Sequence, residues 1–184
     1  MSEVLDAPQT SGPPSAYFPN VGDAVIVGIV DVNEYQQKDY DTGEPKTWPD
    51  GGKVMGKVVT GLVMSTTGTA GSGGEKNNSP IAPGDLVTFW CEGGKFYTYR
   101  DAVKAHGAVQ VGDVMRWARI DDKPPKNARH NPQKVYEARI RKPKAEDGDI
   151  VARCRVKRDE LHAQQLDAPP ATAASPFDDP AGDF

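Results

Sequence analysis

Apolar residues recur along the chain in short runs that begin after the same two-residue signal. A Gly-Asp pair opens the segments VGDAVIVGIV from residue 21, PGDLVTFW from residue 83 and VGDVMRWARI from residue 111. Glycine lets the chain turn, the aspartate side chain can accept hydrogen bonds from nearby backbone, and the β-branched and aromatic residues that follow favour an extended chain. The pattern predicts three β-strands, each beginning just after a turn.

Two more segments have the pattern of strands. GGKVMGKVVTGLVM, at residues 51–64, follows a turn-rich connection, and KVYEARIRKP, at residues 134–143, alternates Tyr136, Ala138 and Ile140 with charged side chains. Such alternation places the apolar residues of a strand on one face and the charged residues on the other. Five strands are therefore predicted in all.

One helix is predicted between the third and fourth strands. In KFYTYRDAVKAHG, residues Phe96, Tyr99, Val103 and His106 recur at helical spacing, and Gly107 can end the helix as its C-cap. The element order is then β, β, β, α, β, β, which is that of the OB-fold, a five-stranded Greek-key barrel. We expect a mostly β protein with this barrel between a disordered N-terminal arm and a disordered C-terminal tail.

The predicted boundaries follow changes in composition. Residues 1–19 and 167–184 contain few large apolar residues and several prolines, so both are predicted to be disordered. The barrel is placed at residues 20–145. Residues 146–166 form a basic extension, and its pattern fits either a sixth strand or one helix.

Composition supports a β-rich chain and narrows its chemistry. The 184 residues are 37% hydrophobic, with 19 glycines and 16 prolines, which suits short strands and many turns. No apolar run approaches the roughly 20 residues that span a bilayer, and the N-terminus lacks a signal-peptide pattern, so we expect a cytoplasmic protein without membrane contact. The two cysteines and three histidines have no metal-ligand spacing, and we expect neither a metal nor another cofactor.

Charge is distributed unevenly although the net charge is only −4. Residues 95–158 contain 17 lysines and arginines against eight acidic residues, which gives this segment a charge of +9. Residues 167–184 contain aspartates as their only charged side chains. A basic body with an acidic tail is typical of a protein that binds a polyanion, and the tail can compete for the same site. The alternative is a solvated charged surface without a ligand.

No segment contains a catalytic or nucleotide-binding motif, so we do not expect an enzyme. CEGGKFY lacks the spacing of a phosphate-binding loop, and DYDTGE matches a calcium loop only in its first positions. Basic residues are instead interleaved with aromatic ones, and single-stranded nucleic acid needs cations for its phosphates and flat rings for its bases. The residues predicted to bind it, on strands and on the two loops that flank an OB-fold groove, are Tyr35, Lys38, Tyr40, Trp48, Lys53, Lys57, Arg116, Arg119, Lys126, Arg129, Arg139 and Arg141.

The aromatic residues divide into core and surface. Trp48 and Tyr35 are the rings expected to stack on bases, because both lie in or beside a polar loop. Replacing Trp48 by Ala is predicted to weaken binding without unfolding the domain. Of the adjacent Phe89 and Trp90, one is expected to point inward and the other outward, and Trp117 is expected in the core.

Four segments together resemble single-stranded DNA-binding proteins of actinobacterial phages and their hosts. They are YDTGEPKTWPDGGKVMGKVVTGL, GGKFYTYRDAVKAHGA, VGDVMRWARIDD and NPQKVYEARI, and the resemblance covers roughly residues 21–143. Its most specific parts are the Asp-Thr-Gly-Glu-Pro loop before Trp48 and the Asn131-Pro132 approach to the last strand. The resemblance implies an OB-fold and a role in protecting single strands during DNA replication, recombination and repair, in the host cytoplasm if the protein is phage-encoded.

The C-terminal sequence SPFDDPAGDF is similar to the tails of bacterial single-stranded DNA-binding proteins. Those proteins end in a disordered linker and an acidic tip closed by Phe, which replication and repair enzymes recognise. The resemblance implies that Asp178, Asp179, Asp183 and Phe184 bind replication or recombination proteins that offer a basic rim and an apolar pocket. The tip departs from that pattern in its internal Ala-Gly and its earlier proline. The alternative is a tail that only adds solubility.

Two other functions remain open. A phage structural or assembly protein built on a small β-barrel predicts a fixed oligomer and no affinity for nucleic acid. An RNA-binding OB module shares every charge and aromatic prediction, and only a site that senses the 2′-OH would distinguish it. A homo-oligomer is compatible with all three functions.

Overall fold

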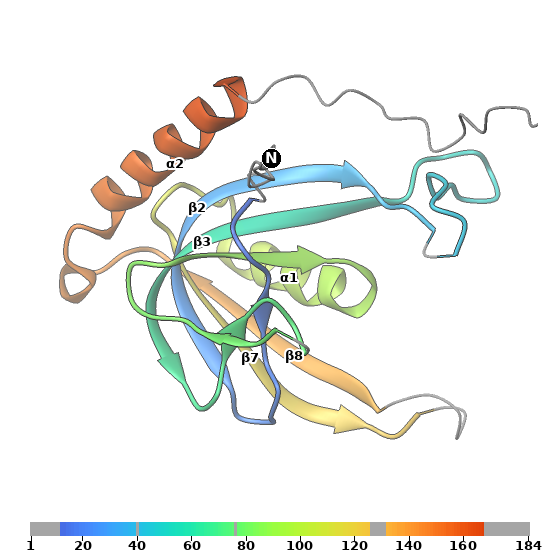
Figure 1. The fold of residues 1–184 in the computed structure, drawn as a ribbon, viewed down its shortest axis with the longest axis horizontal. Coiled ribbons are helices and arrows are strands. Elements are labelled where there is room, and N and C mark those ends of the chain that lie inside the picture. Colours follow the sequence, from blue (N-terminus) through green and yellow to red (C-terminus); the bar gives the residue numbers. More distant parts are fainter. Residues whose placement is uncertain (1–11, 40, 76, 126–131, 168–184) are drawn as a thin grey trace, which may run out of the picture.

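The computed structural model describes residues 12–39, 41–75, 77–125 and 132–167, and these form a mostly β protein (Figure 1). Five strands make one antiparallel sheet in the order β6-β3-β2-β7-β8, and three very short strands make a second sheet in the order β1-β4-β5. The elements are β1 (Ala16–Tyr17), β2 (Ala24–Gln36), β3 (Met55–Thr67), β4 (Gly71–Ser72), β5 (Ser79–Pro80), β6 (Leu86–Cys91), α1 (Gly93–His106), β7 (Val114–Lys123), β8 (Gln133–Arg141), a 3-10 helix η1 (Ala145–Asp147) and α2 (Ile150–Asp167).

The three Gly-Asp turns are confirmed, and each precedes a long strand. Gly22, Gly84 and Gly112 have φ angles of 96°, 99° and 87°, a region that favours glycine. The aspartate after each glycine accepts a hydrogen bond from the backbone N–H three residues before it, at 2.7, 2.8 and 2.8 Å. These turns therefore set the starting points of β2, β6 and β7.

The helix between the third and fourth long strands is also confirmed. It ends at His106, and the backbone N–H of Gly107 donates to the carbonyl of Val103 at 2.8 Å. Tyr99 and Val103 lie on its inner side and pack against the interior of the sheet. Helix α1 therefore covers one end of the curved sheet.

The sheet is not closed into a barrel, which corrects the sequence prediction. In the part of the chain that the structure describes, no strand pairing joins the two edge strands β6 and β8. The gap between them is occupied by residues 14–19, which we call the N-terminal strap. The strap covers part of the unpaired edge of β6. The backbone N–H of Thr88 on this edge donates a hydrogen bond to the carbonyl of Pro14 at 2.9 Å.

The strap also corrects the predicted disordered arm of residues 1–19 over residues 14–19, whereas residues 1–11 lie outside the described residues. Its Phe18 is only 4% exposed and packs between Phe89 of β6 and Tyr136 of β8, at ring-centroid distances of 6.4 and 5.8 Å. Ala16–Tyr17 pairs with Gly71–Ser72 as the start of the small sheet. Prolines and small residues surround Phe18 in the sequence, so composition alone did not indicate that this segment is anchored in the fold.

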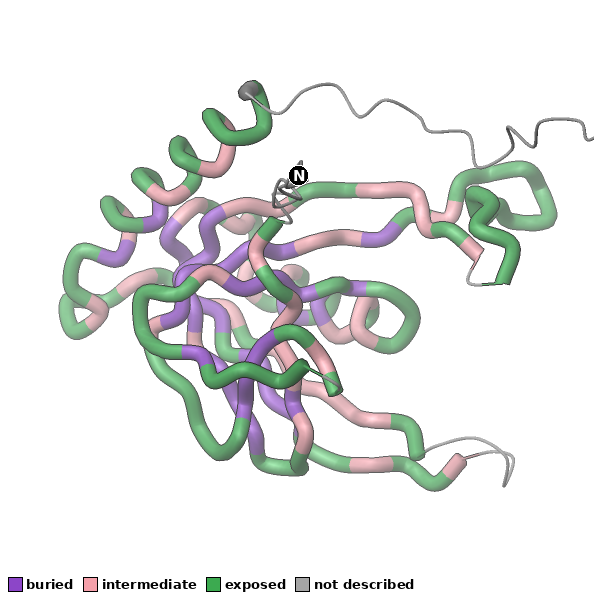
Figure 2. The backbone as a smooth tube through the Cα atoms, viewed as in Figure 1, coloured by how far each residue is buried: buried purple, intermediate pink, exposed green. Residues whose placement is uncertain are grey.

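The buried apolar residues form two clusters that pack against the sheet. Figure 2 shows the buried residues gathered in the central parts of the strands. The inner cluster is built from alternate residues of the strands and contains Trp117, as predicted. The outer cluster lies beneath α2, where Ile150, Cys154 and Leu161 recur at helical spacing and cover Gly28 of β2. A Cβ at Gly28 would lie 2.6 Å from Sγ of Cys154, so glycine allows this close approach. The basic extension is thus a helix rather than a sixth strand.

The strands β2 and β3 extend together beyond the rest of the sheet (Figure 1). Their pairing continues to Gln36 and Met55, whereas β2 pairs with β7 only from Ala24 to Gly28. The connection of residues 37–54 at the end of this hairpin contains two isolated bridges, Lys38 with Pro45 and Thr47 with Lys53. It is therefore an ordered projection rather than a loose loop.

Candidate nucleic-acid interface

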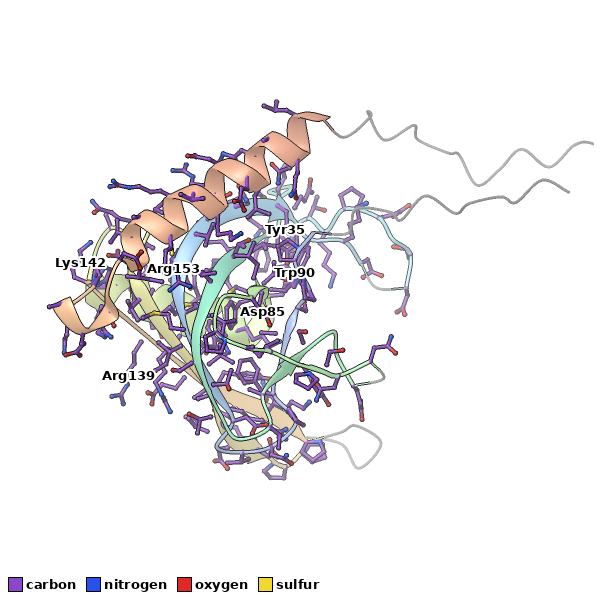
Figure 3. All side chains as sticks on the ribbon, turned by 60° about the vertical axis from the view of Figure 1, so that its left-hand side comes forward. Tyr35, Asp85, Trp90, Arg139, Lys142 and Arg153 are labelled. Carbon is purple, nitrogen blue, oxygen red and sulfur yellow. The ribbon has the colours of Figure 1, made fainter. Side chains whose placement is uncertain are left out.

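An aromatic pair lies on the outer face of the sheet where the long hairpin meets β6. The rings of Tyr35 and Trp90 are 5.1 Å apart at their centroids and nearly perpendicular, with an interplanar angle of 75°. Trp90 is 48% exposed, while its neighbour Phe89 is buried on the inner face, as alternation along a strand requires. Figure 3 shows Tyr35 and Trp90 side by side. An exposed indole held by a second ring is a surface on which a planar ligand can stack.

Tyr35 is fixed in place from two sides. Its ring lies over Gly56, where a Cβ would come within 2.7 Å of Cζ. Its hydroxyl donates a hydrogen bond to the carboxylate of Glu92. Burial and this hydrogen bond raise the pKa of Tyr35 above its ordinary value, so the phenol stays neutral. Trp90 therefore packs against a ring that cannot rotate freely.

A hollow of about 510 Å³ opens beside Trp90, between the ends of β6 and β8. We call it the Trp90 hollow; its lining includes Tyr17, Trp90, Lys95, Lys134 and Tyr136. The carboxylate of Glu92, which accepts the hydrogen bond of Tyr35, lines it as well. Each lysine ammonium lies 5.0 Å from the centroid of a tyrosine ring, Lys95 over Tyr136 and Lys134 over Tyr17. Cations and rings in one depression are the combination that single-stranded nucleic acid requires.

Lys95 is the more enclosed of the two lysines. Burial lowers its pKa below the ordinary lysine value, and the nearby charge of Lys134 lowers it further. A cation in such a place lacks part of its hydration. It therefore gains more from an approaching phosphate than a fully solvated lysine does.

The sequence that connects β7 to β8 is basic. Residues 123–134 contain four lysines and arginines and no acidic residue. Lys123 is exposed at the end of β7. The predicted ligands Lys126 and Arg129 in this connection, like Tyr40 and the tail residues Asp178, Asp179, Asp183 and Phe184, lie outside the described residues.

The hairpin connection of residues 37–54 does not form the expected basic clamp. Lys38 and Lys53 are exposed there, but four acidic residues outnumber the three lysines of the connection. Lys53 also precedes β3, which begins at Met55, so the expected strand face shared by Lys53 and Lys57 is not formed. Attraction of phosphate by this projection is therefore offset within the projection itself.

Trp48 and Lys57 are not brought together with Tyr35. Trp48 is 55% exposed and lines a separate hollow between the hairpin connection and the start of α1. Lys57 binds Glu34 at 2.5 Å and lines a neighbouring hollow beside Tyr99. Two of the predicted ligands thus belong to the α1 side of the hairpin.

Arg119 is a structural residue, which overturns its predicted place in the interface. Its side chain is buried, at 7% residue exposure, and two of its nitrogens bind the Asp122 carboxylate at 2.7 to 3.0 Å. The third donates to the carbonyls of Phe18, at 3.1 Å, and Pro19. The guanidinium therefore holds the strap and has no donor directed toward solvent.

The remaining arginines form a group of their own on β7 and β8. Arg116 and Arg139 face each other in the strand register and share Glu137, at 3.9 and 2.5 Å. Arg141 binds Asp147 at 2.6 Å, and this contact holds the pKa of that carboxyl down at about 2. Figure 3 shows Arg139 well away from Tyr35 and Trp90. These cations are matched by carboxylates and do not line the Trp90 hollow.

The predicted set contains none of the described residues that line the Trp90 hollow. Trp90 could have been included, because alternation places one of two adjacent aromatic residues outside. Lys134 is the second residue of β8, and Lys95 stands in the first turn of α1. Tyr17 had no usable signal, because its position depends on Phe18 beside it.

Comparison with protein-family models, with curated proteins and with solved structures gives no match to this chain. No helix within the described residues is long and apolar enough to cross a membrane. The described part of the chain also contains no cluster of His, Cys, Asp and Glu that could hold a metal ion. The function must therefore be argued from the geometry.

Proposed function

We propose that this protein is a non-enzymatic, sequence-tolerant single-stranded DNA-binding protein, and that the Trp90 hollow is the centre of its site. The observation that carries the proposal is the exposed indole of Trp90, held edge-on by Tyr35 beside two lysines that lie over tyrosine rings. Bases would stack on the exposed rings while Lys95 and Lys134 neutralise phosphates.

The arrangement of strands supports an OB-fold with an unusual closure. The order β6-β3-β2-β7-β8 and the helix between β6 and β7 agree with a five-stranded Greek-key barrel opened between its third and fifth strands. The N-terminal strap occupies the opening. The Trp90 hollow then lies at the start of β8, and in OB-folds the ligand groove is flanked by the connection that leads into this last strand and by the connection between the first two strands.

The acidic tail extends the proposal to partners. Asp178, Asp179, Asp183 and Phe184 would recruit replication or recombination proteins, in a cytoplasmic role in DNA replication, recombination and repair. This part rests on the sequence and on its resemblance to the tails of bacterial single-stranded DNA-binding proteins.

The test is fluorescence anisotropy of labelled oligo-dT, with Trp90→Ala compared against Trp48→Ala. Both tryptophans are about half exposed, so both variants should fold. Trp90→Ala should weaken binding by about tenfold or more, because a stacked base is worth about 1 to 3 kcal/mol. Trp48→Ala should bind as the wild type does, which revises the expectation from the sequence.

Three outcomes would contradict the proposal. Absence of oligo-dT binding at low salt, together with a fixed oligomer, would favour the structural or assembly protein. Displacement of oligo-dT by duplex DNA of equal length would remove the single-strand preference. Tighter binding of oligo-U than of oligo-dT would indicate the RNA-binding module.

A further inference from the structure

Two adjoining hollows lie between the long hairpin and α1, away from the Trp90 hollow. The first, of about 490 Å³, is lined by Trp48, Met55 and Tyr97 at the start of the helix. The second, of about 330 Å³, is lined by Tyr99 and Val103 further along the helix. Phe96 lines both, so they form one depression, which we call the α1 groove.

The α1 groove leaves large apolar side chains in contact with water. Trp48, Met55 and Tyr97 are all exposed, and they come from two elements that are distant in the sequence. Scattered apolar residues are ordinary on a protein surface, whereas a group that converges on one depression marks a site of interaction. The floor beneath them is aliphatic, with Val103 and Val109 among its members.

The charges that line the groove have one sign. Lys46, Lys57, Arg100 and Lys104 line the two hollows, and no carboxylate does so among the described residues. Acids just outside the lining already reach two of these cations, Glu34 at 2.5 Å from Lys57 and Asp101 beside Arg100 at 3.1 Å. Lys46 and Lys104 make no ion pair within the described residues, so these two cations remain available for the carboxylates of a ligand.

We infer that the α1 groove binds an acidic peptide segment of a partner protein. Leucine or phenylalanine side chains of the segment fill the two hollows, and its carboxylates meet Lys46 and Lys104 on the rim. The groove is separate from the Trp90 hollow, so this inference does not depend on the proposed function.

The shape of the groove favours a peptide over nucleic acid. A base needs an open ring face, but the face of Tyr97 is already covered by the guanidinium of Arg100, at 4.8 Å from the ring centroid. Phe96 meets Tyr97 edge to face, with an interplanar angle of 83°. Branched side chains such as Val103 make a floor that suits an inserted aliphatic or aromatic side chain.

The test uses the full chain and a short fluorescein-labelled peptide that alternates Glu and Asp with Leu and Phe. The wild type should bind this probe, and the double variant Arg100→Glu/Lys104→Glu should weaken binding by about tenfold or more, because unlike charges would become like charges. The matched control is Arg116→Glu/Arg139→Glu, which makes the same change of charge on β7 and β8 and should leave probe binding unchanged.

A second pair of variants tests the apolar half of the inference. Trp48→Ala and Tyr97→Ala should each lower the affinity for the probe several-fold. An otherwise identical peptide with Ser in place of Leu and Phe should not bind the wild type. Oligo-dT binding should stay at its wild-type level in both variants, which separates this result from any failure of the proposed function.

Four results would overturn the inference. They are no binding of the probe to the wild type, an equal loss in the control charge reversal, displacement of the probe by oligo-dT, and a concentration-dependent dimer that Trp48→Ala abolishes. The third would make the groove a nucleic-acid surface, and the fourth would make it an interface between two copies of this chain.

Discussion

The Trp90 hollow and the arginine-bearing strands β7 and β8 are both basic in sequence, yet they differ in how their charges are satisfied. On β7 and β8, Arg116 and Arg139 share Glu137, and Arg141 is held by Asp147. In the Trp90 hollow, Lys95 and Lys134 lie over tyrosine rings, and the one carboxylate in the described lining, Glu92, accepts the hydrogen bond of Tyr35. The region with fewer cations is thus the one better prepared for an anionic ligand.

The difference shows that a count of basic residues is a weak guide to an anion site. A cation that already holds a carboxylate must break that contact before it binds a phosphate, whereas a cation over a ring keeps its donors available. Arg119 is the extreme case, since all of the described hydrogen bonds of its side chain go to Asp122 and to the strap. Four experiments test whether the two regions differ in this way.

The largest effect is expected from the anchor of the strap, on which the Trp90 hollow depends. Phe18→Ala should lower the free energy of unfolding by about 3 to 5 kcal/mol, because it leaves a cavity between β6 and β8. Urea unfolding measures this change, and Val21→Ala, at an exposed position, is the control. A loss below about 1 kcal/mol would mean that the strap is not part of the stable fold.

Arg119→Ala should come next, with a loss of about 3 kcal/mol of stability. The substitution leaves the carboxylate of Asp122 and the carbonyl of Phe18 without their partner. Oligo-dT affinity, measured at a temperature where the variant is folded, should change little. A loss of affinity without a loss of stability would return Arg119 to the interface.

The salt dependence of DNA binding compares the two regions directly. Lys95→Ala/Lys134→Ala should reduce the slope of log affinity against log salt by about 1.4, since each phosphate contact to a single strand contributes about 0.7. Arg116→Ala/Arg139→Ala should leave the slope close to that of the wild type. Equal reductions in the two double variants would remove the distinction between the regions.

The smallest effect concerns the pH dependence of binding. Burial lowers the pKa of Lys95, so as the pH rises this lysine loses its proton before an exposed lysine does. Oligo-dT affinity should therefore begin to fall at alkaline pH while the other lysines are still charged. Lys95→Arg keeps the charge and should delay the fall, and identical profiles of the two proteins would exclude Lys95 from the site.

Much of the fold could be predicted because its signals are local. The Gly-Asp turns, the alternation along β8 and the helical spacing in α1 each involve a few neighbouring residues. Whether the edge strands β6 and β8 pair with each other could not be predicted in the same way. It depends on Phe18, a single apolar residue whose partners Phe89 and Tyr136 are distant in the sequence.

The sequence predicted the types of side chain that meet at the candidate site better than it predicted the individual residues. Basic and aromatic side chains do meet, and Tyr35 is one of them. The choice between Trp48 and Trp90, however, depends on which side of the long hairpin each ring faces. Likewise, whether an arginine is available depends on carboxylates such as Glu137 and Asp147, whose pairing is set by the folded sheet.

The strap has a consequence for the order in which the protein is made. The side chain of Arg119 that holds the carbonyl of Phe18 is 101 residues further along the chain, and Tyr136 is later still. During synthesis the strap leaves the ribosome before its partners exist, and domains fold as units once their chain is available. The strap is the first described segment to be synthesised, but it is among the last to pack into the fold. A bulky fusion joined directly to it would therefore slow the last step of folding.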